Sequence, residues 1–161
     1  MSEQNSKIIQ AEKIIRQYAD MIYRIAMHNL KNPADAEDIF QDVCLTLLTK
    51  NAPLFDDVHI KNWLIRVTIN KCKNFMKSHW QSKTEALDLS RENPNETQNL
   101  IPELVYSLPK KYRNIVYLYY YEEYTVPEIA DILGENKNTV NSRLQRARKK
   151  LKEILEEGDN S

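Results

Sequence analysis

Apolar residues recur at helical spacing along most of this 161-residue chain. Between residues 8 and 30 they stand three or four positions apart, which predicts one face of an amphipathic helix. Asn32 and Pro33 then predict a break and a new helix, because asparagine caps a first turn and proline needs no hydrogen bond there. The apolar stripe of this second helix comprises Ala36, Ile39, Phe40, Val43, Leu47 and Leu48.

A third helix is expected after a turn that contains Pro53, and either Asp56 or Asp57 can cap it. Residues 81–102 interrupt the periodicity: they are rich in Ser, Thr, Asn, Gln and Glu and contain two prolines, which predicts a flexible linker. The apolar stripe of the third helix comprises Ile60, Leu64, Val67 and Cys72.

Helical signals resume after the linker. The tyrosine-rich stretch 112–124 has strand propensity, but its position between helical signals favours a helix, with the tyrosines used for packing rather than as a stacking platform. We therefore expect an all-α fold of two small helical domains, over residues 8–80 and 103–157, joined by the flexible linker 81–102.

The second domain contains the signals of a helix-turn-helix. Thr125 and Glu128 have the spacing of a capping box, and Gly134 is expected to end this short helix in the left-handed conformation. Asn138 is expected to cap a longer, basic helix. A short helix, a glycine-containing turn and a longer basic helix are the parts of a helix-turn-helix. The apolar stripe of the long helix comprises Val140, Leu144, Ala147, Leu151 and Leu155.

Composition excludes several classes of protein. The chain has only two glycines, which argues against a glycine-rich phosphate loop. It contains no run of 18 apolar residues, so no membrane span is predicted. The N-terminus lacks the pattern of a secretory signal, so we expect a cytoplasmic protein. Cys44 and Cys72 are expected to be buried thiols rather than a disulfide. No metal-ligand spacing, cofactor motif or catalytic constellation is present in the sequence, so an enzyme is not expected.

A net charge of zero conceals blocks of opposite sign. Residues 34–57 hold six acids and one lysine, residues 58–84 hold six bases and no acid, and residues 136–152 hold seven bases and no acid. Such runs often form solvated helix faces. Basic segments also neutralise phosphates and release counterions, so each of the two is a candidate nucleic-acid surface.

The two basic segments differ in character. In a helix-turn-helix, the first residues of the second helix lie nearest the base edges, where Asn and Gln suit adenine and Arg suits guanine. A basic surface helix that binds no DNA is the alternative. The candidates for base contacts are Asn138, Thr139, Asn141, Ser142, Arg143, Gln145 and Arg146, and those for phosphate contacts are Arg148, Lys149 and Lys150.

The first basic segment mixes aromatic and amide side chains with lysines, which suits an unstacked single strand of nucleic acid. Packing of Trp63 and Phe75 in a core is the alternative. The polar flank of this segment runs in steps of three and four through Trp63, Arg66, Asn70, Lys73, Asn74 and Lys77.

The chain resembles the extracytoplasmic-function sigma factors of bacteria, in the sigma-70 family. The resemblance rests on DAEDIFQDVCLTLL (35–48), IKNWLIRVTINKCKNFMK (60–77) and LPKKYRNIVYLYYYEEYTVPEIADILGENKNTVNSRLQRARKKL (108–151). It implies sigma domains 2 and 4, binding to core RNA polymerase, and promoter-specific initiation. It also implies an anti-sigma factor as partner and no membrane insertion. The matching polymerase-docking residues are Asp35, Glu37, Asp38, Gln41 and Asp42.

The same resemblance assigns promoter contacts. The helix with Trp63, Arg66, Asn70, Lys73, Asn74 and Lys77 would open and read the minus-ten element as single strand, with Asn70 at a flipped base. Residues from Lys137 to Arg146 would read the minus-thirty-five element as duplex. Glu135 departs from the family, which usually has an apolar residue after this glycine, and Asn141 replaces a common lysine.

Two other functions compete with this prediction. A helix-turn-helix regulator that binds duplex DNA without polymerase would share the second domain but would need no acidic docking face in the first. A protein-interaction adaptor would leave both basic segments as solvated surfaces. We therefore predict a sigma factor, with the polymerase-independent regulator as the alternative.

Overall fold

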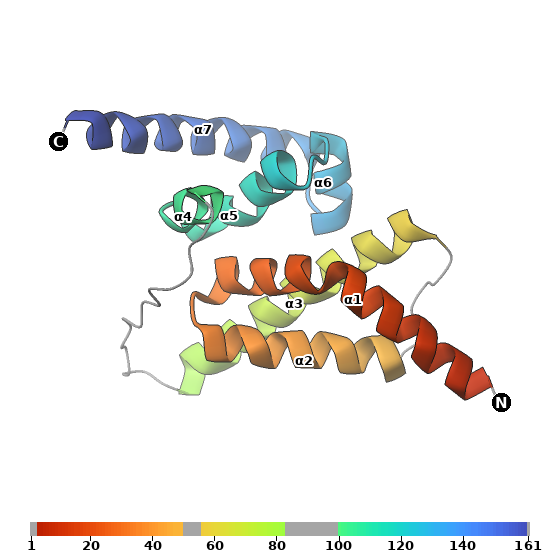
Figure 1. Cartoon of the computed structure of the whole chain (residues 1–161). Helices are drawn as coiled ribbons and strands as arrows, with labels where there is room; N and C mark the ends of the chain where they lie inside the picture. Colours follow the sequence, from red (N-terminus) through yellow and green to blue (C-terminus); the bar gives the residue numbers. More distant parts are fainter. Residues whose placement is uncertain (1–2, 50–55, 83–99, 161) are drawn as a thin grey trace. The chain divides into compact units, whose positions relative to one another are not determined.

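Helices account for all the regular structure of the described residues. The structure is a computed structural model that describes residues 3–49, 56–82 and 100–160, and within these ranges no strand is present (Figure 1). Contacts divide the chain into two units, Met1–Asn93 and Pro94–Ser161. The predicted all-α fold is confirmed. Most of the predicted linker, residues 83–99, lies outside the described residues, and α3 and α4 occupy its two ends.

The described residues of the first unit form three helices, α1 (Glu3–Leu30), α2 (Pro33–Thr49) and α3 (Asp57–Ser82), each of which packs against the other two (Figure 1). Asn32 caps α2 as predicted, since its Oδ1 accepts a hydrogen bond from the amide of Asp35 at 3.0 Å. The core is formed from all three helices and contains Ala11, Tyr18, Met21, Ile22, Ile25, Ala36, Ile39, Val43, Leu47, Ile60, Leu64, Ile65, Ile69 and Cys72.

Three predicted stripe positions of α2 and α3 are not buried, and one of them, Phe40, is half-buried. Leu48 is exposed, because twelve residues of helix after Ala36 turn it about 120° from the buried stripe. Val67 is half-buried, whereas Ile65 and Ile69 are buried. The buried face of α3 is broader than a single stripe because α1 and α2 both pack on it.

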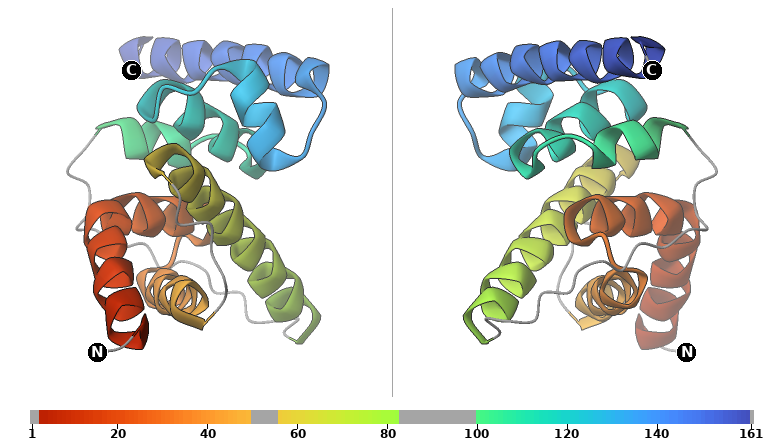
Figure 2. Two further views of the ribbon diagram at one scale, coloured as in Figure 1. Left: turned by 90° about the vertical axis from the view of Figure 1, so that its right-hand side faces the viewer. Right: turned by 90° about the vertical axis from the view of Figure 1, so that its left-hand side faces the viewer.

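The second unit contains α4 (Leu100–Tyr106), α5 (Lys110–Val116), the π-helical turn η1 (Tyr117–Tyr121), α6 (Val126–Leu133) and α7 (Lys137–Asn160). α7 packs against α5 and α6, and Figure 2 shows it as the long blue helix along one side of this unit. Leu155 was predicted to be in the core but is 54% exposed, so the packed part of α7 ends near Leu151.

Candidate functional site

The acidic residues of α2 lie on the side that faces away from the core. Glu37, Asp38, Gln41 and Asp42 are exposed and Asp35 is half-buried; we call these five the acidic face. Gln41 Nε2 donates to Glu37 Oε2 at 3.3 Å, which links two successive turns of this surface. The structure thus brings together all five residues that the sequence singled out.

Sequence reasoning missed the apolar continuation of the acidic face. Leu45 is 58% exposed and Leu48 is 36% exposed, one and two turns after Gln41 on the same side of α2. Asp38, Gln41, Leu45 and Leu48 follow one another in steps of three or four residues, and this spacing could have revealed the two leucines. The outer side of α2 is therefore acidic toward its N-terminus and apolar toward its C-terminus.

The basic residues of α3 share one exposed side of the helix. We call the residues from Trp63 to Lys77 on this side the basic flank. Trp63 is half-buried, which leaves part of its ring at the surface beside the amides and lysines. The exposed members of the basic flank are Arg66, Asn70, Lys73, Asn74 and Lys77.

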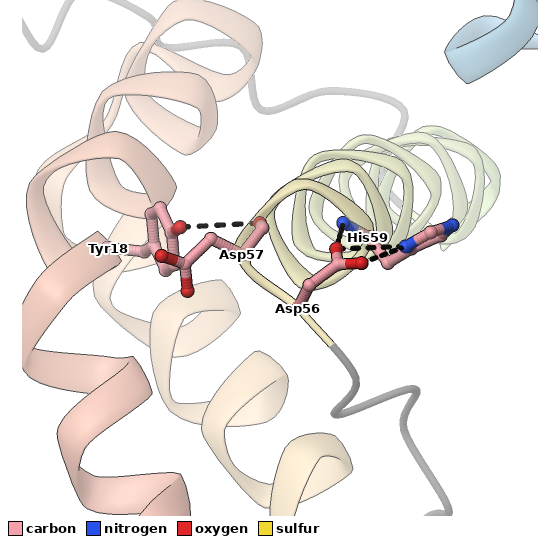
Figure 3. Close-up of polar contacts among 4 residues, drawn as sticks. All are labelled: Tyr18, Asp56, Asp57 and His59. Atoms are coloured by element: carbon pink, nitrogen blue, oxygen red, sulfur yellow. Dashed lines mark hydrogen bonds and ion pairs between the residues drawn. The ribbon is translucent and has the colours of Figure 1, made fainter.

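The N-terminus of α3 is fixed by polar contacts (Figure 3). Asp56 Oδ1 accepts from the amide of His59 at 2.9 Å, so Asp56 is the cap, and the ring nitrogen Nδ1 of His59 lies 2.9 and 3.0 Å from its two carboxylate oxygens. The hydrogen bonds from His59, first the backbone amide, lower the pKa of Asp56. Tyr18 of α1 donates to the carbonyl oxygen of Asp57 at 3.5 Å. These contacts fix where α3 begins and thus help to orient the basic flank.

The helix-turn-helix has the predicted capping chemistry. Thr125 Oγ1 accepts from the amide of Glu128 at 3.3 Å, and Glu128 Oε1 accepts from the amide of Thr125 at 2.8 Å. Gly134 ends α6 in the left-handed conformation, with φ 69° and ψ 35°. The amide of the next residue, Glu135, then donates to the carbonyl of Ala130 at 2.9 Å, which closes the helix end.

The cap of α7 is Asn136, not Asn138 as predicted. Asn136 Oδ1 accepts from the amide of Asn138 at 2.7 Å, and its carbonyl accepts from Val140 at 3.0 Å. Both asparagines have the right chemistry, and the chain reaches helical geometry sooner after Gly134 than the sequence indicates. Asn138 therefore stands inside the first turn of α7.

The predicted base-contacting residues lie on the outer side and the edges of α7, away from the buried Val140, Leu144 and Ala147. Thr139 and Arg143 are half-buried. The exposed residues are Lys137, Asn138, Asn141, Ser142, Gln145 and Arg146, and the predicted phosphate contacts Arg148, Lys149 and Lys150 are exposed as well.

Two contacts of the α7 arginines were not predicted. Arg143 Nη1 lies 3.6 Å from Glu135 Oε2, so an acid of the turn pairs with a candidate base-reading side chain. Arg148 Nε donates to the hydroxyl of Tyr120 at 2.6 Å. Neither partner could be identified from helical spacing, because each belongs to another element.

Among the residues that the structure describes, no group of His, Cys, Asp and Glu is arranged to hold a metal ion. The helices in the same ranges include none that is long and apolar enough to cross a bilayer. The candidate site consists of three surfaces: the acidic face, the basic flank and the outer side of the helix-turn-helix.

Comparison with known proteins assigns both units to one kind of protein. Residues 14–82 match the family described as Sigma-70 region 2, and residues 98–151 match Sigma-70, region 4. RNA polymerase sigma factor SigV of Bacillus subtilis is 31% identical over 144 residues, which cover 85% of this chain and 86% of the relative. ECF RNA polymerase sigma factor SigE of Mycolicibacterium smegmatis is 29% identical over 159 residues, or 89% and 61% of the two chains.

Solved structures share the fold. The sigma factor RpoE of Bartonella quintana, in complex with the anti-sigma factor NepR, aligns with a TM-score of 0.68 at 18% identity, over 90% of this chain and 96% of the other. CnrH, in complex with the cytosolic domain of CnrY, aligns with a TM-score of 0.60 at 17% identity, over 91% and 87%. The likeness thus extends across both units of the chain.

Proposed function

The chain belongs to the sigma-70 family of RNA polymerase sigma factors, in its extracytoplasmic-function group, and from this premise we propose which surface performs each step. It is an alternative sigma factor that binds core RNA polymerase and directs promoter-specific transcription initiation. The observation that carries the assignment of steps is the separation of charge: the first unit presents an acidic face and a basic flank on different helices, and the second presents a basic recognition helix. A sigma factor has no catalytic step of its own, so each surface must act by binding.

The acidic face docks on the clamp helices of core polymerase. Asp38 and Gln41 are exposed near its centre, and Leu45 and Leu48 extend it with apolar area. Charged groups steer the encounter of two proteins, whereas buried apolar side chains contribute most of the affinity. A surface that contains both suits a tight, oriented complex with a basic partner.

The basic flank of α3 opens and reads the minus-ten element. Asn70 is exposed in the middle of this side, between Arg66 and Lys73. An amide can hydrogen-bond the edge of an extruded base, and the neighbouring cations attract the single-stranded backbone. Trp63, half-buried at one end of the flank, offers a ring face on which a base can stack.

The helix-turn-helix reads the minus-thirty-five element as duplex. The first turns of α7 enter the major groove, with Asn138, Ser142 and Gln145 on its exposed outer side. Amide side chains there can pair with adenine, and Arg146 can pair with guanine. The exposed Lys149 stands a further turn along and contacts phosphate.

Regulation and location follow from the family by analogy. Two solved structures with this fold are complexes, one of the sigma factor RpoE with the anti-sigma factor NepR and one of CnrH with the cytosolic domain of CnrY. We extend this to the present chain: an anti-sigma factor binds it and keeps the two units from engaging polymerase. The protein works in the cytoplasm, where polymerase and promoters are.

In vitro transcription tests these assignments. The purified chain is combined with core polymerase and a library of genomic fragments, and we expect discrete start sites with a shared pair of upstream elements. Asp38→Arg should abolish transcription because it places a cation where the acidic face meets a basic partner. Asn70→Ala should lower transcription about tenfold, because it removes one specific base contact. Polymerase binding should stay intact.

A matched control is Asp20→Arg, the same charge reversal at an exposed position of α1 outside the acidic face. This variant should transcribe like the unchanged chain. Equal losses from Asp20→Arg and Asp38→Arg would contradict the docking role. If core polymerase yields no transcript while the free chain binds duplex promoter specifically, the polymerase-independent regulator becomes the better account.

A further inference from the structure

Two arginines of α7 are held in different ways. Arg143 pairs with the carboxylate of Glu135 at 3.6 Å. Arg148 instead donates from Nε to the hydroxyl oxygen of Tyr120 at 2.6 Å, and within the described part of the chain no carboxylate pairs with it. The carboxylate of Glu135 therefore offsets the positive charge of Arg143, whereas no described carboxylate offsets that of Arg148.

The two phenol rings of η1 fix the guanidinium of Arg148. Its central carbon lies 5.4 Å from the ring centre of Tyr119 and 5.8 Å from that of Tyr120, within the range of cation–π attraction. The rings themselves pack edge to face at 4.9 Å. The hydrogen bond to Tyr120 is the first cause that raises the pKa of Arg148. A charged side chain that is already positioned loses less conformational entropy when it binds a ligand.

Part of the guanidinium remains for an anion, beside the hydrogen bond to Tyr120 and a weaker one to Tyr119. Nε of Arg148 faces Tyr120, so the two Nη groups stand on the rest of the planar guanidinium, and their hydrogens suit paired oxygens. The hydroxyl of Tyr120 accepts from Arg148, so its own hydrogen can be donated elsewhere. Tyr120 is 46% exposed, so a ligand can reach this hydroxyl.

We propose that Tyr120 and Arg148 form a binding site for a backbone phosphate of the promoter duplex, with Tyr119 as the supporting ring. This rests on the proposed reading of the minus-thirty-five element by α7. Arg148 stands ten residues after Asn138, about 15 Å along the helix axis, beyond the turns that face the bases. It shares one edge of α7 with Asn141, seven residues earlier. A phosphate contact there positions the helix in the groove without reading sequence.

Phosphate neutralisation tests the site directly. Holoenzyme is assembled on a promoter fragment found by in vitro transcription, and single phosphates around the minus-thirty-five element are replaced by uncharged methylphosphonates. With the unchanged chain, neutralising the contacted phosphate should weaken binding about tenfold. Arg148→Gln should bind the natural fragment about tenfold more weakly and lose its sensitivity to that one phosphate. Equal sensitivity of both proteins at every phosphate would overturn the proposal.

Three further variants distinguish a binding site with fixed geometry from a positive charge that attracts the phosphate without a fixed position. Arg148→Lys keeps the charge without the planar fork, and it should still bind several-fold more weakly than the unchanged chain. Tyr120→Phe removes one oxygen and should cost about threefold at the same phosphate. Tyr121→Phe is the matched control, since it removes a neighbouring hydroxyl that does not contact Arg148, and it should bind normally. Normal binding by Arg148→Lys and Tyr120→Phe together would refute the built site.

A second probe distinguishes this proposal from the proposed function. The free full-length chain is titrated with a short duplex of arbitrary sequence at increasing salt. Arg148→Gln should reduce the slope of log affinity against log salt by about 0.9, as expected for one lost phosphate contact. If holoenzyme shows no minus-thirty-five binding but this change persists, the proposed function fails and the phosphate site stands. An unchanged slope counts against the site.

Discussion

The geometry of the helix-turn-helix depends on a left-handed residue between α6 and α7. The substitution Gly134→Ala tests how much unfolding free energy this conformation costs an L-residue. At φ 69° and ψ 35°, a Cβ built on Gly134 would meet no heavy atom within 4 Å. The substitution therefore adds no clash, and its cost is that of the backbone conformation alone. An L-residue pays about 1–2 kcal/mol in this region, and the smaller entropy of its unfolded chain offsets about 0.4–1 kcal/mol. The net loss of unfolding free energy should be about 1 kcal/mol.

The distribution of aromatic residues allows this loss to be assigned to one unit. Both tryptophans, Trp63 and Trp80, belong to the first unit, and all of the nine tyrosines except Tyr18 and Tyr23 belong to the second. Tyrosine circular dichroism in the near ultraviolet then follows mainly the second unit, and tryptophan fluorescence follows the first. For a unit of this size, 1 kcal/mol should lower the tyrosine-detected Tm by about 4–8 °C and leave the tryptophan transition in place.

Gly134→Asn provides the control, because asparagine adopts the left-handed conformation more readily than alanine and should lose less. A loss above about 3 kcal/mol for Gly134→Ala would mean that the new methyl group meets packed atoms, contrary to the open space around Gly134. A clear gain in stability would mean that the turn does not need a positive φ. Either result would refute the reasoning.

Two other substitutions and one labelling experiment have definite expected outcomes. Glu123 also has a positive φ, 62°, so Glu123→Gly should raise the tyrosine-detected Tm slightly, and a fall would contradict the strain. Leu64 is fully buried, so Leu64→Ala should cost about 2–5 kcal/mol in urea unfolding followed by tryptophan fluorescence; less than about 1 kcal/mol would argue against close packing there. Burial raises the pKa of the Cys72 thiol to about 12, so at pH 8 about one thiol in ten thousand is ionised. Mass spectrometry should find Cys72 alkylated more slowly than the half-buried Cys44, whose pKa is raised first by burial and then by Glu37; the reverse order would contradict it.

Helix starts could be predicted because their chemistry is local. Asn32, Asp56 and Thr125 each cap the helix that the sequence indicated, through a side-chain oxygen and an amide three residues later. The prediction was wrong at Asn138, because Asn136 has the same side chain two residues earlier. The choice between them depends on the path that the backbone takes after Gly134, which local sequence does not determine.

Buried faces were predicted less well than helix starts. Periodicity gives the direction of an apolar stripe, but the width and length of the buried face depend on how many helices pack on it. Two helices cover α3, so Ile65 is buried beyond its stripe, while nothing described covers Leu155 at the far end of α7. Such differences follow from tertiary packing and could not be obtained from one segment at a time.

The same distinction holds for the candidate site. The sequence indicated which residues lie at the surface, since every residue assigned to the acidic face, the basic flank and the outer side of α7 is exposed or half-buried. It did not indicate their partners. Tyr120 and Arg148 are 28 residues apart and belong to different elements, so only the packing of η1 beside α7 brings them together. Contacts of this kind decide which cations stay available for DNA.

Asp42 shows why such partners matter for interpreting mutations. Its Oδ2 lies 3.4 Å from Nζ of Lys71 on α3, with the side chains 55% and 24% exposed. An exposed pair like this contributes at most about 1 kcal/mol to stability, but it joins the acidic face to the helix that carries the basic flank. Reversing Asp42 would place a cation against Lys71 and disturb α3, so the polymerase docking and minus-ten reading that we propose for these two surfaces would change together. Asp38 has no described ion pair, so reversing it would change the acidic face alone and separate the two proposed functions.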